Sequence, residues 1–103
     1  MAVYVDTPFR SRLSGELVCH LSADSSAELH GFAARIGVGT FRFVRGRCLP
    51  GESHHPVFSH YLIPASLRAA AVAAGAVPES PQDAVDRAHA YERTRLRALA
   101  LSR

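Results

Sequence analysis

The sequence contains no lysine, and all twelve of its basic side chains are arginine, which gives a formal net charge of +3 at pH 7. Arginine suits phosphate and carboxylate binding because its planar guanidinium offers several donors in a fixed fork. Heavy use of arginine and alanine can equally follow from genome composition. A phosphate-containing small molecule is therefore one candidate partner, and charge alone does not single it out.

Long apolar runs are also absent. The longest, at residues 69–76, is far shorter than the roughly 20 residues that a transmembrane helix needs. The first ten residues include an acid, Asp6, and lack the stretch of about seven to fifteen apolar residues found in a signal peptide. We expect a cytoplasmic protein with no membrane partner.

Cysteine is scarce as well. Cys19 and Cys48 lie far apart and form no C-x-x-C pair, so the sequence indicates neither a disulfide framework nor a sulfur-rich zinc knuckle. A chain of 103 residues has room for one domain with a small core. We predict a single α/β domain over residues 1–92 and a basic helical extension over residues 93–103.

Four segments have the composition of β-strands: residues 2–6, 17–22, 40–45 and, as a shorter piece, 76–79. They are rich in β-branched or aromatic side chains and are bounded by proline, glycine and polar residues. In the second segment, alternation places Cys19 on one face with apolar neighbours and His20 on the other. Cys19 is therefore expected in the core, and not as a catalytic partner of His20.

Three helices are predicted among these strands. Ser25 and Glu28 have the spacing of a capping box, and an apolar stripe at helical spacing leads from them to Gly37. Pro64 is expected to open the second helix, and Ser80 to cap the third. The order of segments predicts an α/β fold, with a small single-domain sheet of three to four short strands, at least partly parallel, and three helices.

Five blocks of sequence follow one another in a specific order: VYVD near the start, CHLSADS after the first loop, ELHGFAARIGV, HY at residues 60–61, and LRAAAVAAGAV. This pattern, over residues 2–82, resembles the domain of unknown function 4031 family of short bacterial and phage proteins. The resemblance implies no activity, but it implies polar positions at Asp6, His20, Asp24, Glu28, His30, His60, Tyr61 and Arg68. Similar proteins usually have aspartate where this chain has Leu62, so an acid with a role at that position would be missing here.

Polar side chains cluster at the predicted strand ends. Asp6 ends the first strand, His20 and Asp24 lie at or just past the end of the second, and His60 precedes the second helix. Ligands of open α/β sheets bind beyond the carboxyl ends of the strands, so these side chains are expected to share one edge. Asp6, His20, Asp24 and His60 are the candidate catalytic residues.

The same group has the composition of a metal site. Imidazole and carboxylate bind zinc and other first-row divalent ions, and His30, about a turn and a half into its helix, can lean toward the same edge. His20, Asp24, His30 and His60 are the candidate ligands of a divalent metal cofactor such as zinc, although their spacing matches no recognised zinc motif. The same side chains also suit acid–base catalysis near neutral pH.

Two more residues are candidates for substrate binding: Tyr61, and Arg68, which could orient a phosphate. Each assignment has a structural alternative, in which a histidine is half-buried and bonded to backbone, Asp6 caps a turn, and Tyr61 packs its ring in the core. The sequence supports a metal- or phosphate-binding, hydrolase-like site as the leading hypothesis, with these alternatives open.

Two other classes of function also remain open. The arginines could form a nucleic-acid-binding surface, although few aromatic residues lie among them and no known motif is present. Alternatively, the protein could be an interaction module without catalysis that uses its last helix, and that helix is also the basis for expecting a homo-oligomer. The loop at residues 46–59, with His54 and His55, is long enough to be functional.

Overall fold

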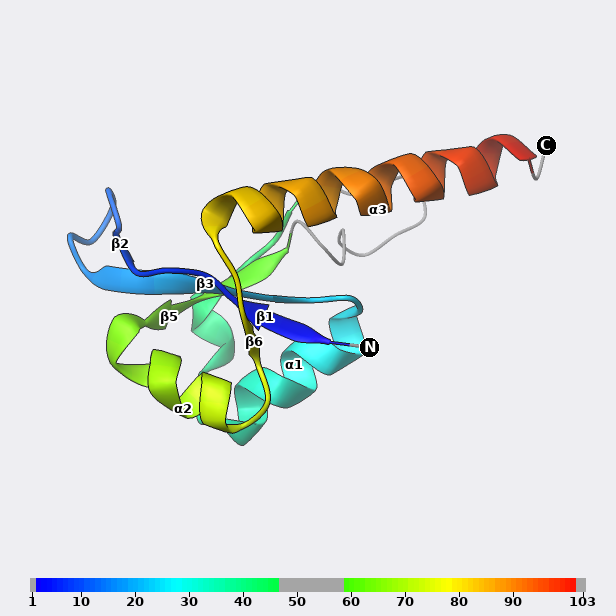
Figure 1. The fold of residues 1–103 in the computed structure, drawn as a ribbon. Helices are drawn as coiled ribbons and strands as arrows, with labels where there is room; N and C mark the ends of the chain where they lie inside the picture. Colours follow the sequence, from blue (N-terminus) through cyan, green and yellow to red (C-terminus); the bar gives the residue numbers. More distant parts are fainter. Residues whose placement is uncertain (1, 47–58, 102–103) are drawn as a thin grey trace.

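The computed structural model describes residues 2–46 and 59–101, and within them a mixed sheet is covered by helices on both faces (Figure 1). The strands are β1 Val3–Val5, β2 Phe9–Arg10, β3 Leu17–Ala23, β4 Phe43–Val44, β5 His60–Pro64 and β6 Val77–Pro78. The α-helices are α1 Ser26–Arg35, α2 Arg68–Ala73 and α3 Pro81–Leu101. Most of the predicted loop at 46–59, including His54 and His55, lies outside the described residues.

The order of strands across the sheet is β4-β5-β3-β1-β6, and β2 also pairs with β3. Only β1 and β6 pair in parallel among the described strands, because every other pair is antiparallel. The predicted α/β class, the partly parallel sheet and the three helices are confirmed. The predicted number of strands is too low, since the sheet formed by the described residues has six. The two strands that were missed are β2, which has only two residues, and β5.

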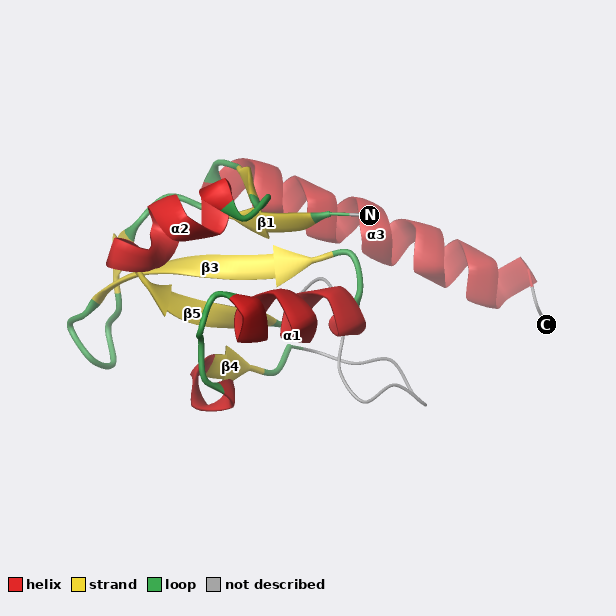
Figure 2. Ribbon diagram, turned by 90° about the horizontal axis from the view of Figure 1, so that it is seen from below, coloured by secondary structure: helices red, strands yellow, loops and turns green. Residues whose placement is uncertain are grey.

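The hydrophobic core lies on one face of the sheet. Helices α1 and α2 cover this face, and α3 lies across the opposite face (Figures 1 and 2). Leu29 and Phe32 of α1 pack in the core cluster with Leu21 of β3 and Ile63 of β5. Cys19 is fully buried in the same cluster. The predicted alternation along β3 is therefore confirmed, with Cys19 toward the core.

The predicted start and end of the first helix are also confirmed. Ser25 is the N-cap of α1, and its side-chain oxygen accepts a hydrogen bond from the Glu28 backbone N–H at 3.3 Å. Gly37 has φ of +80°, a left-handed conformation that glycine adopts without a Cβ clash. At α3, Ser80 likewise accepts a bond from the Asp83 N–H at 3.1 Å, as the sequence indicated.

Two predicted elements differ from the structure. Residues Thr40–Arg42 form a single 3-10 turn, and only Phe43–Val44 of the predicted strand 40–45 joins the sheet. Pro64 is the last residue of β5 and the N-cap of the 3-10 turn Ala65–Leu67, which leads into α2 at Arg68, so it precedes the helical segment and does not lie in its first turn. Proline has no N–H to extend the ladder, so it suits the end of a strand as well as the start of a helix. No helix among the described residues is long and apolar enough to cross a membrane.

Candidate functional site

The site is centred on a carboxylate at the end of β1. Asp6 is only 3% exposed, and its Oδ1 accepts the backbone N–H of His20 at 2.6 Å. The backbone of Asp6 is fixed from two sides, because its N–H donates to the His20 carbonyl at 3.1 Å and its own carbonyl accepts the Arg68 Nε–H at 2.9 Å. The carboxylate is therefore held in one orientation by β1, β3 and α2.

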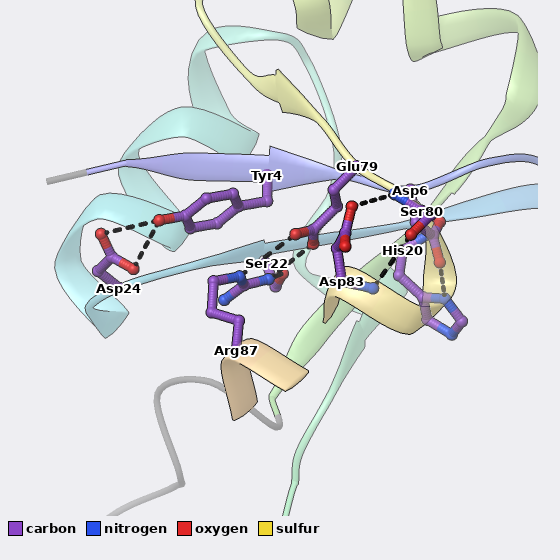
Figure 3. Close-up of polar contacts among 9 residues, drawn as sticks. All are labelled: Tyr4, Asp6, His20, Ser22, Asp24, Glu79, Ser80, Asp83 and Arg87. Atoms are coloured by element: carbon purple, nitrogen blue, oxygen red, sulfur yellow. Dashed lines mark hydrogen bonds and ion pairs between the residues drawn. The ribbon is translucent and has the colours of Figure 1, made fainter. Parts of the chain in front are cut away.

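Its second oxygen meets an imidazole. Nδ1 of His20 lies 2.6 Å from Asp6 Oδ2, and the His20 side chain is 39% exposed. Because a carboxylate accepts hydrogen bonds, the neutral form of His20 that fits this contact carries its ring hydrogen on Nδ1 and has its acceptor, Nε2, on the far side of the ring. Figure 3 shows this second nitrogen directed away from Asp6. The pair has the arrangement of an oriented base, in which a buried acid fixes the tautomer of an accessible histidine.

Aromatic rings fix the plane of this imidazole. Phe9 of β2 stacks on His20 with a centroid separation of 4.5 Å, and the ring of His60 meets it edge-on at 4.7 Å. Leu62 is the residue directly opposite His20 in the β3–β5 register. The position at which the sequence resemblance implies an aspartate is thus the cross-strand neighbour of His20, and here it carries an apolar side chain.

A pocket of about 360 Å³ lies between this face of the sheet and α3. The sheet contributes Asp6, His20, Ser22 and His60, and α3 contributes Pro81, Ala84, Val85, Arg87, Ala88 and His89. The volume is in the range of small-molecule sites, about 300–1,000 Å³. His20 therefore presents its accessible edge to a space that can hold a ligand.

Arg87 fastens α3 over the sheet beside this pocket. Its Nη2 donates to Glu79 Oε1 and to Ser22 Oγ, both at 2.7 Å, and its guanidinium lies 3.7 Å above the centre of the Tyr4 ring. The Tyr4 hydroxyl in turn donates to the Asp24 carboxylate at 3.1 Å. These contacts join β1, β3, β6 and α3, as Figure 3 shows.

The structure brings together some of the predicted site residues and separates others. Asp6, His20 and His60 line the pocket, and Arg68 contacts the Asp6 backbone from outside it. Asp24 instead accepts hydrogen bonds from the Ala2 N–H and the Tyr4 hydroxyl. Tyr61 is fully buried in the core, as its structural alternative predicted.

His30 lies on the other side of the sheet from the pocket. It sits on α1, and its Nδ1 lies 2.7 Å from the hydroxyl of the core residue Tyr61. Among residues 2–46 and 59–101, no three histidine, cysteine, aspartate or glutamate side chains are grouped so that they could hold a metal ion. The four side chains considered as zinc ligands are thus not gathered at one point.

The expectation of one shared edge assumed parallel strands. β1 and β3 are antiparallel, with Val3 opposite Ala23 and Val5 opposite Leu21, so their carboxyl ends point in opposite directions. Asp24 consequently lies at the amino end of β1, whereas Asp6 lies beside the middle of β3. Phe9 and Ser22 had no feature in the sequence that marked them as site residues, and Arg87 and His89 were not included because α3 had no expected position on the sheet.

Comparison with known proteins places the chain in a family. The family model described as protein of unknown function DUF4031 matches residues 3–91. The chain belongs to this family. The match confirms the resemblance drawn from the sequence blocks. The matched residues of this chain include every pocket residue named above. No curated protein and no solved structure matches the chain.

Proposed function

We propose that this DUF4031 protein is a small hydrolase-like enzyme in which His20 acts as a general base toward a water molecule and Asp6 fixes its tautomer. The observation that carries this proposal is the 2.6 Å contact between Asp6 Oδ2 and His20 Nδ1, made by a buried acid at the floor of a pocket. An oriented imidazole of this kind typically contributes about 10²–10⁴-fold to a reaction rate.

The chemistry follows from the two ring nitrogens. Nε2 of His20 takes a proton from water while the water oxygen bonds to the electrophilic centre of the substrate. The bond from that centre to the leaving oxygen then breaks, and the imidazolium returns the proton to the leaving group. One water is consumed for each bond broken, and His20 recovers its starting tautomer. The Asp6 carboxylate keeps its contact with Nδ1 and stabilises the transient imidazolium.

The residues of the site support acid–base catalysis more directly than the other hypotheses. A metal-dependent version would need ligands from outside the described residues, because Asp24 and His30 lie away from His20. Nucleic-acid binding receives less support, since Arg10, Arg42, Arg68 and Arg87 donate hydrogen bonds to backbone or side-chain oxygens of the chain itself. Both remain alternative proposals.

The test is hydrolysis of phenyl acetate and phenyl phosphate by purified protein and by Asp6→Asn. The asparagine carbonyl can still accept the His20 backbone N–H. Its amide N–H, however, donates to Nδ1 and so moves the ring hydrogen to Nε2, and Nε2 can then no longer accept a proton. We expect hydrolysis of at least one substrate, and a loss of about 10²–10⁴-fold in kcat in the variant. Asp86→Asn is the matched control, because Asp86 is an exposed acid of α3 that bonds to Gln82.

The ring nitrogens can also be observed directly. Two-dimensional ¹H–¹⁵N spectra of the histidine side chains should show hydrogen on Nδ1 of His20 in the parent protein and on Nε2 in Asp6→Asn. Equal hydrolysis by the parent, Asp6→Asn and His20→Gln proteins would show that these residues do not form the catalytic group, even if a pocket ligand were found.

A further inference from the structure

The wall of the pocket formed by α3 differs chemically from its floor. Pro81, Ala84, Val85 and Ala88 recur at the spacing of one helical face, and all four line the pocket. Ala88 is buried and Val85 is half-exposed, so the wall extends from the interior to the rim. Because these side chains are small and apolar, the helix lies over the sheet without filling the space beneath it.

The charges around the pocket are already matched within the protein. The Arg87 guanidinium is paired with Glu79, whose side chain is only 9% exposed, and stacks on Tyr4. The Asp6 carboxylate is occupied by the backbone and ring of His20. An anionic ligand drawing Arg87 away would leave the Glu79 carboxylate buried without a partner, which is strongly unfavourable.

We propose that the pocket binds an uncharged substrate with an apolar group, such as an aryl or alkyl ester, and that Ala84, Val85 and Ala88 determine the size of the group that fits. The inference rests on the proposed function, because it names the substrate class of the same site. The apolar group lies against α3, and the bond to be hydrolysed faces His20 across the pocket.

The size of the pocket agrees with this occupant. An apolar cavity of about 150 Å³ holds a benzene molecule, so a pocket of about 360 Å³ accommodates one ring together with an ester or amide group. Ser22 Oγ and the imidazoles supply the few polar groups that would orient such a ligand, in the usual pattern of an apolar site with a small number of polar contacts.

One feature of the site makes an anion the competing occupant. Nη1 of Arg87 is buried and has no hydrogen-bond partner among residues 2–46 and 59–101, although the other two guanidinium nitrogens are bonded to Glu79. The probes are therefore acetanilide, which is neutral and resists hydrolysis, and phenyl phosphate, which carries the same ring on an anion. Binding is followed by the chemical shifts of the histidine rings and alanine methyl groups.

We expect acetanilide to shift the resonances of His20, His60 and Ala84 in a saturable manner, and phenyl phosphate to bind at least about tenfold more weakly, a difference of about 1.4 kcal/mol. Ala84→Phe fills the pocket and should weaken acetanilide binding by about tenfold or more. Ala90→Phe, on an exposed face of the same helix, is the matched control and should leave affinity within about twofold. If Ala84→Phe does not fold, Ala84→Leu gives the same comparison with a smaller side chain.

Tighter binding of phenyl phosphate than of acetanilide would overturn the inference and indicate an anion site at Arg87. Acetanilide affinity that is unchanged in both Ala84→Phe and Ala84→Leu would overturn it as well, because the ligand would then lie elsewhere. These outcomes are separate from those for the proposed function. Hydrolysis that depends on Asp6 in a protein that does not bind acetanilide would leave the catalytic proposal standing and remove only the substrate class.

Discussion

At the scale of single residues, two histidines show how the sheet assigns different roles to the same side chain. His20 faces the pocket, where a buried acid fixes its ring and its outer nitrogen remains accessible. His30 faces the core side, where its Nδ1 contacts the Tyr61 hydroxyl and its ring packs at a centroid distance of 4.8 Å from Phe43. His20 lines the pocket, whereas these contacts of His30 are with residues on the core side of the sheet.

The Tyr61 contact leads to a prediction for stability at alkaline pH. Burial raises the pKa of Tyr61 above its ordinary value near 10, because the charged phenolate would lie in the core. Because the folded protein holds the Tyr61 proton more tightly than the unfolded chain does, the contribution of the neutral side chain to stability is fully present below pH 10. It is lost as pH rises through the pKa of the folded state. Urea denaturation should therefore give a free energy of unfolding that declines above about pH 10.

Tyr61→Phe tests the same contact. The variant should be destabilised by about 0.5–1.5 kcal/mol at neutral pH through the lost His30 bond, and its alkaline decline should be shallower. Some decline should remain, because burial and the hydrogen bond to Asp24 also raise the pKa of Tyr4. An alkaline profile identical to that of the parent protein would show that Tyr61 ionisation does not limit stability.

The sequence predicted site residues whose position follows from a local pattern, and it misplaced those whose position depends on pairing between distant segments. Asp6 and His20 stood out as polar side chains at the ends of predicted strands, and His60 because it precedes the predicted second helix. Asp24 was grouped with them because the carboxyl ends of strands were assumed to meet. The antiparallel pairing of β1 and β3 depends on the whole sheet, and no local pattern in either strand encodes it.

At the scale of elements, β3 shows why part of the fold was predictable. It is the longest strand, with seven residues, its Cys19, Leu21 and Ala23 all point into the core, and it pairs with β1, β2 and β5, so its apolar side chains recur at every second position. β5 has the sequence HYLIP, in which a terminal proline and polar aromatic residues obscure the alternation. Its strand conformation comes mainly from pairing with β3, which is a tertiary effect.

Arg87 holds helix α3 to the sheet through its hydrogen bond to Ser22 and its ion pair with Glu79. Arg87→Met should destabilise the docked helix by about 3 kcal/mol, the lower end for a broken buried ion pair, because Glu79 would remain buried without its partner. The loss should appear as faster amide hydrogen exchange over residues 82–92, while exchange in β3 stays slow, since the helix can detach without unfolding the sheet.

Two comparisons make this prediction specific. Arg93→Met removes an exposed arginine from the same helix and should leave exchange unchanged. The double variant Arg87→Met with Glu79→Met should recover most of the lost protection, because neither charge remains to be desolvated. If Arg87→Met exchanges as slowly as the parent protein, the apolar contacts of α3 hold the helix, and the anchor is not required.

At the scale of the whole molecule, the described residues form an elongated body of 46 × 26 × 23 Å. Its length comes from α3, whose first turns cover the sheet and whose second half extends past it (Figure 1). The two layers around the sheet are therefore unequal. Among the described residues, α1 and α2 close the core side, and α3, whose buried residue is Ala88, closes the pocket side.

The projecting half of α3 carries the last prediction, which concerns self-association. Leu96, Leu99 and Leu101 are exposed there, and the family match ends before them, at residue 91. An isolated helix of this composition is marginal in water and gains stability from a partner surface.

We expect truncation after Glu92 to leave the fold and Tm nearly unchanged, because the buried residues of the sheet and the Arg87 anchor are retained. Light scattering across a range of protein concentrations should show any dimer of the full chain weakened or absent in the truncated form. A truncated protein that unfolds, or that associates as strongly as the full chain, would show that residues 93–103 support the domain or lie outside the interface.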